Sequence, residues 1–144
     1  MATQNEVKKF VKSQPSIRFY KSVQAALAKV LLAMSDKDYK KATKNLFIAA
    51  LHEGSLGQAL HFQNPKGKFK ILQLTFPRTI PQNVLEFVIA HELGHVMQGR
   101  NWQPSDKMNF EMGADAYAAK IGFIKTKSIA RWMKIHGEKL GFLS

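Results

Sequence analysis

The residues in this sequence best suited to chemistry are the two histidines and the glutamate of the segment HELGH at residues 91–95. Residues four apart on an α-helix lie one turn above each other on the same face, so the imidazoles of His91 and His95 can bind one metal ion. Between them, the carboxylate of Glu92 projects beside the ion and can take a proton from water. A pair of surface histidines around an unrelated glutamate would give the same short pattern. The pattern becomes specific only with a third ligand from another part of the chain.

Two acidic residues downstream, Glu111 and Asp115, complete the pattern. They are four apart in a stretch that is helical by composition, with Gly122 as its expected C-cap. Catalytic zinc takes three protein ligands and keeps one position for water, and two histidines with a glutamate are a recurring set. Asp115, one turn after Glu111, is placed to accept the ring N–H of a metal-binding histidine. Three small residues let the two helices approach closely: Ala114, Ala118 and Ala119.

An acidic helix face paired with Lys107 or Lys120 is the alternative explanation for Glu111 and Asp115. In a chain with 22 Lys and Arg but only 10 Asp and Glu, two acids four apart beside alanines are more simply explained by a metal ion. The two motifs together predict one bound zinc ion, with the two histidines and Glu111 as ligands.

The helix that contains the HELGH segment is predicted to begin at Gln82 or Asn83 and to stop at Gly99. Gly94 leaves room for a close neighbour. The helix is expected to be buried around its one polar face. Its buried side is predicted from four apolar residues: Val84, Phe87, Val88 and Leu93.

A β-hairpin is expected immediately before this helix. Residues 58–63 and 69–76 are predicted as strands, and residues 64–67, with proline second and glycine fourth, suit a type I turn. An extended peptide can add to the edge of such a sheet through backbone hydrogen bonds. The hairpin edge is therefore the expected place for a peptide substrate.

The N-terminal third is predicted to be helical, at about residues 5–11, 16–34 and 35–52, with Ser35 as the N-cap of the third helix. Four lysines form the exposed side of that third helix: Lys37, Lys40, Lys41 and Lys44. They are interpreted as a solvated face rather than a nucleic-acid footprint, because that exposed side has no aromatic interleaving and no base-reading motif. An apolar stripe on the second helix is predicted to face the core: Phe19, Val23, Ala26, Val30 and Met34.

The composition of the 144 residues fits one domain, with residues 1–56 as a helical N-terminal segment and residues 57–144 as the part that holds the site. The absence of cysteine excludes disulfides and thiolate zinc sites. No secretory signal pattern begins the sequence, and its longest apolar runs are too short to span a bilayer, so a cytoplasmic location is predicted. The formal net charge of +12 favours nucleic acid, anionic membranes or acidic partners, or else only makes the surface soluble.

The HELGH segment and the later EMGAD segment together resemble the gluzincin metallopeptidases, whose signature is HExxH followed by a glutamate in an ExxxD or ExxAD setting. The hairpin and both ligand helices are similar to the compact ImmA/IrrE-type peptidases, and the second motif also resembles HtpX-like peptidases and minigluzincins. This resemblance implies proteolysis and an α+β, zincin-like fold: N-terminal helices, a small hairpin, the two ligand helices and a C-terminal helix. By position it assigns zinc to His91, His95 and Glu111, the general base to Glu92 and the supporting carboxylate to Asp115.

The sequence thus predicts a zinc metalloendopeptidase that acts on a protein or peptide substrate, with Glu92 as general base. Tyr117 and His136 are candidate donors to the oxyanion that forms during hydrolysis. A Tyr on an Ala-rich helix more often has a core position, and His136 lies in a predicted basic amphipathic helix near the C-terminus. Two other classes of protein stay open: a basic protein that uses the zinc scaffold to bind nucleic acid or a regulatory partner, and a regulator that cleaves one partner only. No oligomeric state is predicted.

Overall fold

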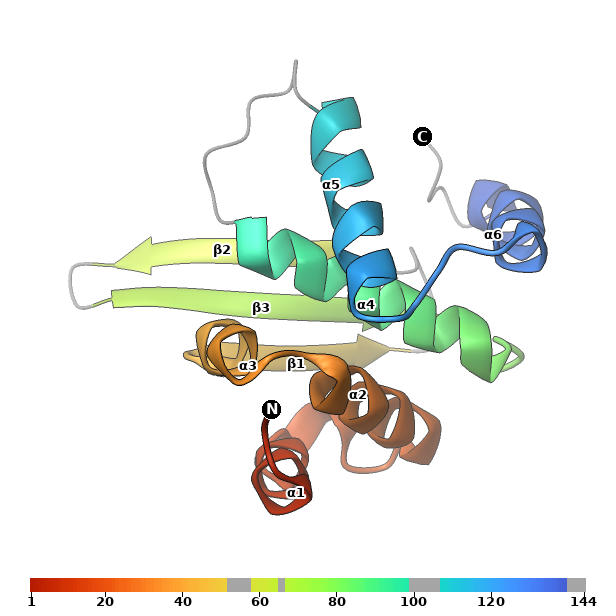
Figure 1. The fold of residues 1–144 in the computed structure, drawn as a ribbon. Helices are drawn as coiled ribbons and strands as arrows, with labels where there is room; N and C mark the ends of the chain where they lie inside the picture. Colours follow the sequence, from red (N-terminus) through yellow and green to blue (C-terminus); the bar gives the residue numbers. More distant parts are fainter. Residues whose placement is uncertain (52–57, 65–66, 99–106, 140–144) are drawn as a thin grey trace.

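The fold is α+β, with six α-helices and one three-stranded sheet in the described part of the chain (Figure 1). The computed structural model describes residues 1–51, 58–64, 67–98 and 107–139. In chain order the elements are α1 (Gln4–Lys12), the short 3-10 helix η1 (Pro15–Ile17), α2 (Lys21–Ala33), α3 (Asp36–Thr43), β1 (Leu46–Leu51), β2 (Gln58–Asn64), β3 (Gly67–Thr75), α4 (Gln82–Gln98), α5 (Lys107–Lys120) and α6 (Lys127–Lys139). None of these helices is both long and apolar enough to cross a membrane.

Strand β3 is the central strand of the sheet, with β1 and β2 at the two edges. β1 runs parallel to β3, with Leu46 opposite Lys70. β2 runs antiparallel to β3, with Asn64 opposite Gly67, so the predicted hairpin is confirmed. Residues 65–66, in the middle of the predicted type I turn, lie outside the described residues.

Strand β1 stands where the second half of a helix was expected, so the helix predicted over residues 35–52 is wrong. α3 ends at Thr43, and Asn45 then takes a left-handed φ of 56°, a conformation that asparagine tolerates and that leads the chain out of the helix. Alternate residues from Leu46 to Ala50 are buried, whereas Phe47 between them is 53% exposed. Pairing with β3 therefore outweighs the helical preference of the alanines in this stretch.

The helix predicted over residues 16–34 is interrupted as well, because η1 ends at Ile17 and α2 begins only at Lys21. The side chain of Gln24 donates to the carbonyls of Ile17 and Arg18, both at 2.8 Å, and so satisfies main-chain groups at the interruption. Phe19 lies here and is 86% exposed, which corrects its predicted place on the core stripe. The other members of that stripe are fully buried: Val23, Ala26, Val30 and Met34.

The N-terminal helices begin with the capping interactions that their sequences favour. Ser35 is the N-cap of α3, as predicted, and its hydroxyl accepts a hydrogen bond from the Asp38 N–H at 3.1 Å. Thr3 caps α1 in the same way, accepting from the Glu6 N–H at 3.1 Å. The Tyr39 hydroxyl donates to the carbonyl of Glu6 at 3.2 Å and ties α3 to α1.

The outer edge of β1 is covered by side chains from the segment around η1. The Gln14 amide accepts from the Ile48 N–H at 2.9 Å and donates to the Leu46 carbonyl at 3.2 Å, as a neighbouring strand would. The Ser16 hydroxyl accepts from the Ala50 N–H at 2.9 Å. Because these polar groups are satisfied within the chain, β1 cannot readily pair with a further strand.

Helix α4 lies against the sheet and contacts most of the other helices (Figure 1). It contacts the hairpin strands on one side and α2, α3, α5 and α6 on others. Leu72 and Leu74 of β3 are fully buried on the helical face of the sheet, whereas Ile71 and Gln73 on the other face are only partly buried. The predicted start of α4 at Gln82 is confirmed, and its predicted stop at Gly99 lies outside the described residues.

Candidate metal centre

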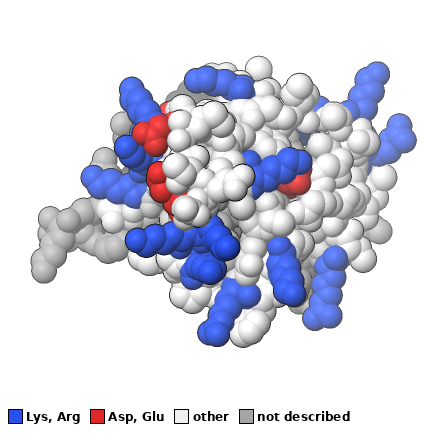
Figure 2. Space-filling model, turned by 60° about the horizontal axis from the view of Figure 1, so that its bottom comes forward, with Lys and Arg blue, Asp and Glu red and all other residues white. Residues whose placement is uncertain are grey.

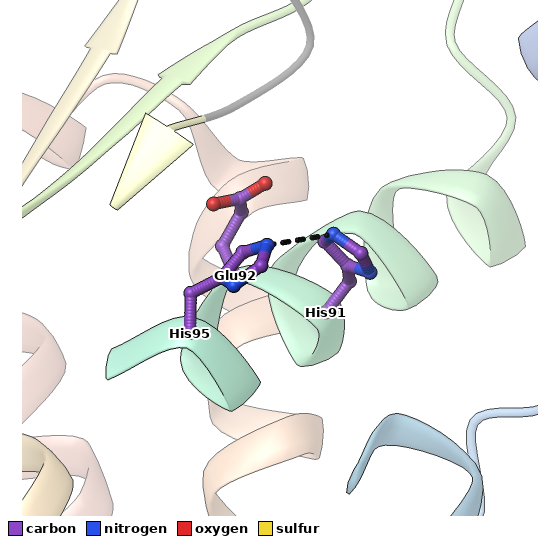
Figure 3. A group of neighbouring side chains, drawn as sticks. All are labelled: His91, Glu92 and His95. Carbon is purple, nitrogen blue, oxygen red and sulfur yellow. Dashed lines mark hydrogen bonds between the residues drawn. The ribbon is translucent and has the colours of Figure 1, made fainter. Parts of the chain in front are cut away.

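Helix α4 carries three potential ligands on adjoining turns. His91 and His95 are each 8% exposed, and Glu92 is 3% exposed. Their ligand atoms all lie within 4.8 Å of one another, so the group can hold a metal ion. Figure 3 shows the two imidazoles facing each other, with the side chain of Glu92 leaving the same stretch of helix. Burial of α4 from Phe87 to Val96 provides the apolar surroundings that the sequence predicted.

Helix α5 brings Glu111 to the same point. One carboxylate oxygen of Glu111 lies 3.0 Å from His91 Nε2, and the other lies 3.1 Å from His95 Nε2. The two Nε2 atoms are themselves 3.1 Å apart. The Glu111 side chain is half exposed, so this carboxylate forms the solvent side of the cluster. The structure thus brings together the three side chains that the sequence assigned as metal ligands.

Gly94 is what allows α5 to lie so close to α4. A Cβ atom on Gly94 would come within 3.0 Å of both the Cα and the carbonyl oxygen of Ala114, and within 3.3 Å of Tyr117 Cβ. Backbone atoms of a packed helix cannot move aside as a flexible side chain can. The predicted close approach at Gly94 is therefore confirmed, and it sets the distance at which Glu111 reaches the histidines.

The prediction that small residues of α5 face α4 is confirmed for two of the three alanines. Ala114 and Ala118 are fully buried, whereas Ala119 is exposed and does not face α4. The predicted C-cap at Gly122 is confirmed by its positive φ of 98°. The N–H of Gly122 donates to the Ala119 carbonyl at 3.0 Å, and the N–H of Phe123 donates to the Ala118 carbonyl at 2.8 Å, the pair of bonds that defines a Schellman motif.

The ring of His91 is oriented by Asp115 of α5. His91 Nδ1 lies 2.7 Å from an oxygen of Asp115, and because a carboxylate accepts, the ring nitrogen is the donor. The other oxygen of Asp115 lies 3.7 Å from the Nζ of Lys125, which also stands 6.0 Å above the ring of Phe87. The structure thus places Asp115 in the supporting position expected for it, and its second oxygen faces Lys125, a residue that sequence reasoning missed.

The ring of His95 is oriented by Gln98, a residue that sequence reasoning missed. His95 Nδ1 donates to the Gln98 side-chain oxygen at 2.8 Å, and the Gln98 NH₂ group donates to the Phe110 carbonyl at 2.9 Å. The second bond fixes which end of the amide faces His95, because a carbonyl can only accept. The ring of Phe110 also stacks on His95, with centroids 5.1 Å apart. Spacing of three residues on one helix is the only sequence signal that connects Gln98 to His95.

The hydrogen bonds of the two rings determine what their other nitrogens can do. Since both Nδ1 atoms donate, the neutral rings present Nε2 lone pairs to each other and to the Glu111 carboxylate. Three acceptors that converge at 3.0–3.1 Å repel one another unless a positive charge lies among them. Ligands bound tetrahedrally at about 2.0–2.1 Å from one metal ion lie about 3.3 Å apart. The two Nε2 atoms and the Glu111 carboxylate therefore fit a metal ion in both chemistry and spacing.

The electrostatics of the cluster favour positive charge at the histidines. Burial alone would lower the pKa of His91, but its hydrogen bonds to Asp115 and Glu111 outweigh burial and raise this pKa to about 9. Burial and the Glu111 hydrogen bond compete in the same way at His95, and its pKa is raised. Hydrogen bonds from the two histidines hold the pKa of Glu111 well below its usual range. The same carboxylates that hold a proton here would stabilise a bound cation.

The two candidate oxyanion donors have their described contacts elsewhere. The Tyr117 hydroxyl donates to Asp38 at 3.0 Å, which links α5 to α3, and burial together with this bond raises the pKa of Tyr117. The ring of His136 stacks on Trp132 with centroids 4.2 Å apart, and its Nδ1 donates to the Trp132 carbonyl at 2.9 Å. Their role in stabilising an oxyanion stays a prediction.

The cluster of His91, Glu92, His95 and Glu111, with its supports Asp115 and Gln98, is the feature from which a function can be argued. These side chains lie on two crossing helices, α4 and α5, and converge from different parts of the chain. Comparisons of the whole chain with protein-family models, with curated proteins and with solved structures found no match.

Proposed function

We propose that this protein is a zinc-dependent metallopeptidase with one zinc ion bound by His91, His95 and Glu111. The observation that carries the proposal is the convergence of two Nε2 lone pairs and a carboxylate at 3.0–3.1 Å. Two imidazoles and one carboxylate, with no thiolate in the chain, suit zinc and leave one position open for water or substrate. The likeness of both motifs to gluzincin signatures supports the same ion.

Glu92 is the proposed general base. Bound zinc would supply Lewis acidity, making water more acidic and polarising a carbonyl oxygen. Glu92 lies between the two histidines in sequence, is 3% exposed, and belongs to the group whose ligand atoms lie within 4.8 Å. The Glu111 carboxylate lies against both Nε2 atoms and Asp115 lies against His91 Nδ1, so the proposal gives these two acids to metal binding and ring orientation and gives proton transfer to Glu92. It accepts the proton of the attacking water and delivers it to the leaving amine.

The proposed substrate is a peptide that binds as an extended strand along β2. Of the two edges of the sheet, that of β1 is already covered by the side chains of Gln14 and Ser16. β2 forms the other edge and contacts α4, the helix of the proposed base. Backbone pairing with β2 would hold a peptide with little dependence on its sequence.

Replacement of Glu92 by glutamine tests the base separately from the metal. We expect Glu92→Gln to retain about one zinc per chain and to lose at least about 100-fold in peptide hydrolysis. Zinc is measured by elemental analysis, and hydrolysis by mass spectrometry on a mixture of random decapeptides. A peptide mixture is the suitable probe, because a peptidase that cleaves one partner only would leave a generic folded protein intact.

Two further sets of variants complete this test. Glu86→Gln makes the same chemical change on the same helix, at a residue that pairs with Lys29 at 3.0 Å, and it should preserve both zinc and hydrolysis. His95→Ala and Glu111→Ala should both lose zinc. Full zinc content in these two variants would refute the ligand set, whereas normal cleavage by Glu92→Gln would refute the base and leave the ligand set standing.

A further inference from the structure

Helices α1 and α3 both carry exposed lysines, and a hydrogen bond links the two helices. Lys37 and Lys41 lie one turn apart on α3, and Lys44 follows at its C-cap. α1 adds Lys8, Lys9 and Lys12, all exposed. The hydrogen bond from the Tyr39 hydroxyl to the Glu6 carbonyl holds the two helices together. Figure 2 shows this side of the protein, where Lys and Arg side chains greatly outnumber acidic ones. These six residues are called the α1–α3 lysine surface below.

The acidic residues of α1 and α3 do little to neutralise this surface. Asp36 pairs with Lys40 at 3.1 Å, which accounts for the fourth lysine of α3. Asp38 and Glu6 keep their negative charges, and the hydrogen bonds described for their side chains come from the neutral hydroxyls of Tyr117 and Thr3. Over residues 4–12 and 36–44 there are seven lysines and three acids, so more than half of the positive charge has no acid to offset it. Among the described residues, no ion pair reaches Lys37, Lys41 or Lys44. The positive charge of the surface is therefore largely uncompensated.

Lys70 of β3 adds a further cation at one end of this surface. Its Nζ donates to the Lys41 carbonyl at 2.6 Å, so it caps the C-terminal end of α3. Burial lowers the pKa of Lys70, and repulsion from Lys41 and Lys44 lowers it further. Capping explains the position of Lys70, but it does not explain why two more lysines stand exposed beside it. A bound polyanion would relieve this repulsion.

The side chains between these lysines distinguish among polyanionic partners. Large exposed apolar residues occur in the described chain, but none belongs to α1 or α3. Protein interfaces need apolar or aromatic anchors, and amphipathic helices that bind membranes insert apolar side chains. Single-stranded nucleic acids are bound by stacking bases on aromatic rings. A surface of lysines alone matches the phosphates of a duplex, whose bases stay stacked inside.

We propose that the α1–α3 lysine surface binds the phosphate backbone of double-stranded nucleic acid without reading its base sequence. This goes beyond the proposed peptidase activity and does not depend on it, because no member of the metal centre belongs to α1 or α3. The sequence alone favours a solvated face for the lysines of α3. The addition of Lys70 and of the α1 lysines to the same region is what changes that interpretation.

Binding to a fluorescein-labelled, random-sequence 20-base-pair DNA duplex tests this proposal, with anisotropy measured over a series of salt concentrations. The test variant is the triple Lys37→Ala, Lys41→Ala and Lys44→Ala. The slope of log K against log salt is negative, and every lysine that no longer neutralises a phosphate makes it shallower by about 0.9. We therefore expect the magnitude of the slope to decrease by about 2.7 in this variant. The second variant, Lys8→Ala, Lys9→Ala and Lys12→Ala, should reduce the slope in the same direction.

The matched control removes three exposed lysines from α5 and α6 instead: Lys120→Ala, Lys127→Ala and Lys134→Ala. All three triple variants lower the net charge equally, so only the position of the removed lysines distinguishes them. The control should bind the duplex as the wild type does, and so should Glu92→Gln.

Equal weakening by the control triple, or no duplex binding at about 50 mM salt, would overturn the proposal. Binding to vesicles of anionic phospholipid but not to the duplex would overturn it as well. Thermal unfolding of each variant verifies its fold, and the α1 triple decides the question if the α3 triple does not fold.

Discussion

The two histidines of the proposed metal centre are supported in different ways. His91 depends on another helix, since its ring donates to the Asp115 carboxylate of α5. His95 depends first on its own helix, where it donates to the neutral amide of Gln98, and only through that amide on the Phe110 carbonyl of α5. A charged hydrogen-bond acceptor strengthens the binding of a proton or a metal ion to its histidine more than a neutral acceptor does. We call His91 with Asp115 the charged half of the site, and His95 with Gln98 the neutral half. The charged half should therefore contribute most of the electrostatic stabilisation of a bound cation, whereas the neutral half should mainly fix the orientation of the His95 ring.

The pH dependence of the metal-free protein should reveal the charged half most strongly. The folded protein raises the pKa of His91 from 6.5 to about 9, so protonated His91 stabilises the fold fully below pH 6.5, and this stabilisation is lost as the pH rises through about 9. The loss amounts to at most about 3 kcal/mol in the free energy of unfolding. Urea unfolding between pH 6.5 and pH 9.5, after removal of metal by a chelator, measures it.

Two comparisons make the pH experiment specific. In Asp115→Asn the dependence should shrink, because the carboxylate that holds the proton on His91 is gone. With zinc present the pH dependence should reverse, so that stability rises with pH, since zinc competes with that proton and binds more tightly as the pH rises. A stability that is flat across this range in the metal-free wild type would contradict the proposed dominance of the charged half.

The approach of α5 to α4 serves both halves, and Gly94→Ala is the substitution that disturbs it. The added Cβ would lie 3.0 Å from the backbone of Ala114, so α5 must move outward, at a cost of about 1–3 kcal/mol in unfolding free energy. Glu111 lies on the same helix, one turn before Ala114, and would move with it. We expect zinc affinity to fall together with stability, as measured by competition with a chromophoric chelator.

Gly122→Ala is the matched control for this change. Gly122 has a φ of 98° with no neighbour within 4 Å of an added Cβ, so alanine there costs about 1–2 kcal/mol of backbone strain without pushing α5 away from α4. Zinc affinity should then stay at the wild-type level although stability falls. If Gly94→Ala also bound zinc normally, the spacing of the two helices would not control the site.

The side chains of the proposed metal centre could be brought together from the sequence because most of their geometry is local. His91 and His95 are four apart, and so are Glu111 and Asp115, so each pair shares a helix face whatever surrounds it. One non-local fact was needed, the contact of the two helices, and glycine opposite alanine indicated it. The α+β class followed from the same reasoning, since the hairpin and the ligand helices have distinct periodicities.

The features that could not be predicted all depend on distant partners. Strand β1 resembles a helix in composition, and only its pairing with β3, which places Leu46 opposite Lys70, makes it a strand. The interruption before α2 depends on Gln24, whose amide satisfies carbonyls that a continuous helix would have satisfied itself. Gln98 escaped notice for a related reason. Its importance comes from the Phe110 carbonyl, which reaches it only because α5 crosses α4 where it does.

The neutral half of the site is expected to give the smallest effect. Gln98→Ala removes the acceptor for His95 Nδ1 but leaves His91, Glu111 and Asp115 in place. Outer-sphere partners of metal ligands contribute about 10–100-fold to metal affinity, and an uncharged partner should fall at the lower end, about tenfold. Nitrogen chemical shifts of the metal-free protein provide the second measurement, taken at a pH well above the His91 pKa of about 9 so that both rings are neutral. His95 should then populate both ring tautomers, whereas His91 keeps its proton on Nδ1.

Gln98→Glu tests whether Gln98 orients the His95 ring or only fills space between α4 and α5. A glutamate keeps an acceptor for His95 Nδ1 but cannot donate to the Phe110 carbonyl, so it should restore the His95 tautomer and recover part of the zinc affinity. It also gives His95 a charged partner like that of His91, and the pKa of His95 should rise above its wild-type value. If the tautomer of His95 did not change in Gln98→Ala, then Gln98 would only fill space between the helices. The two halves of the site would in that case differ in more than the charge of their supports.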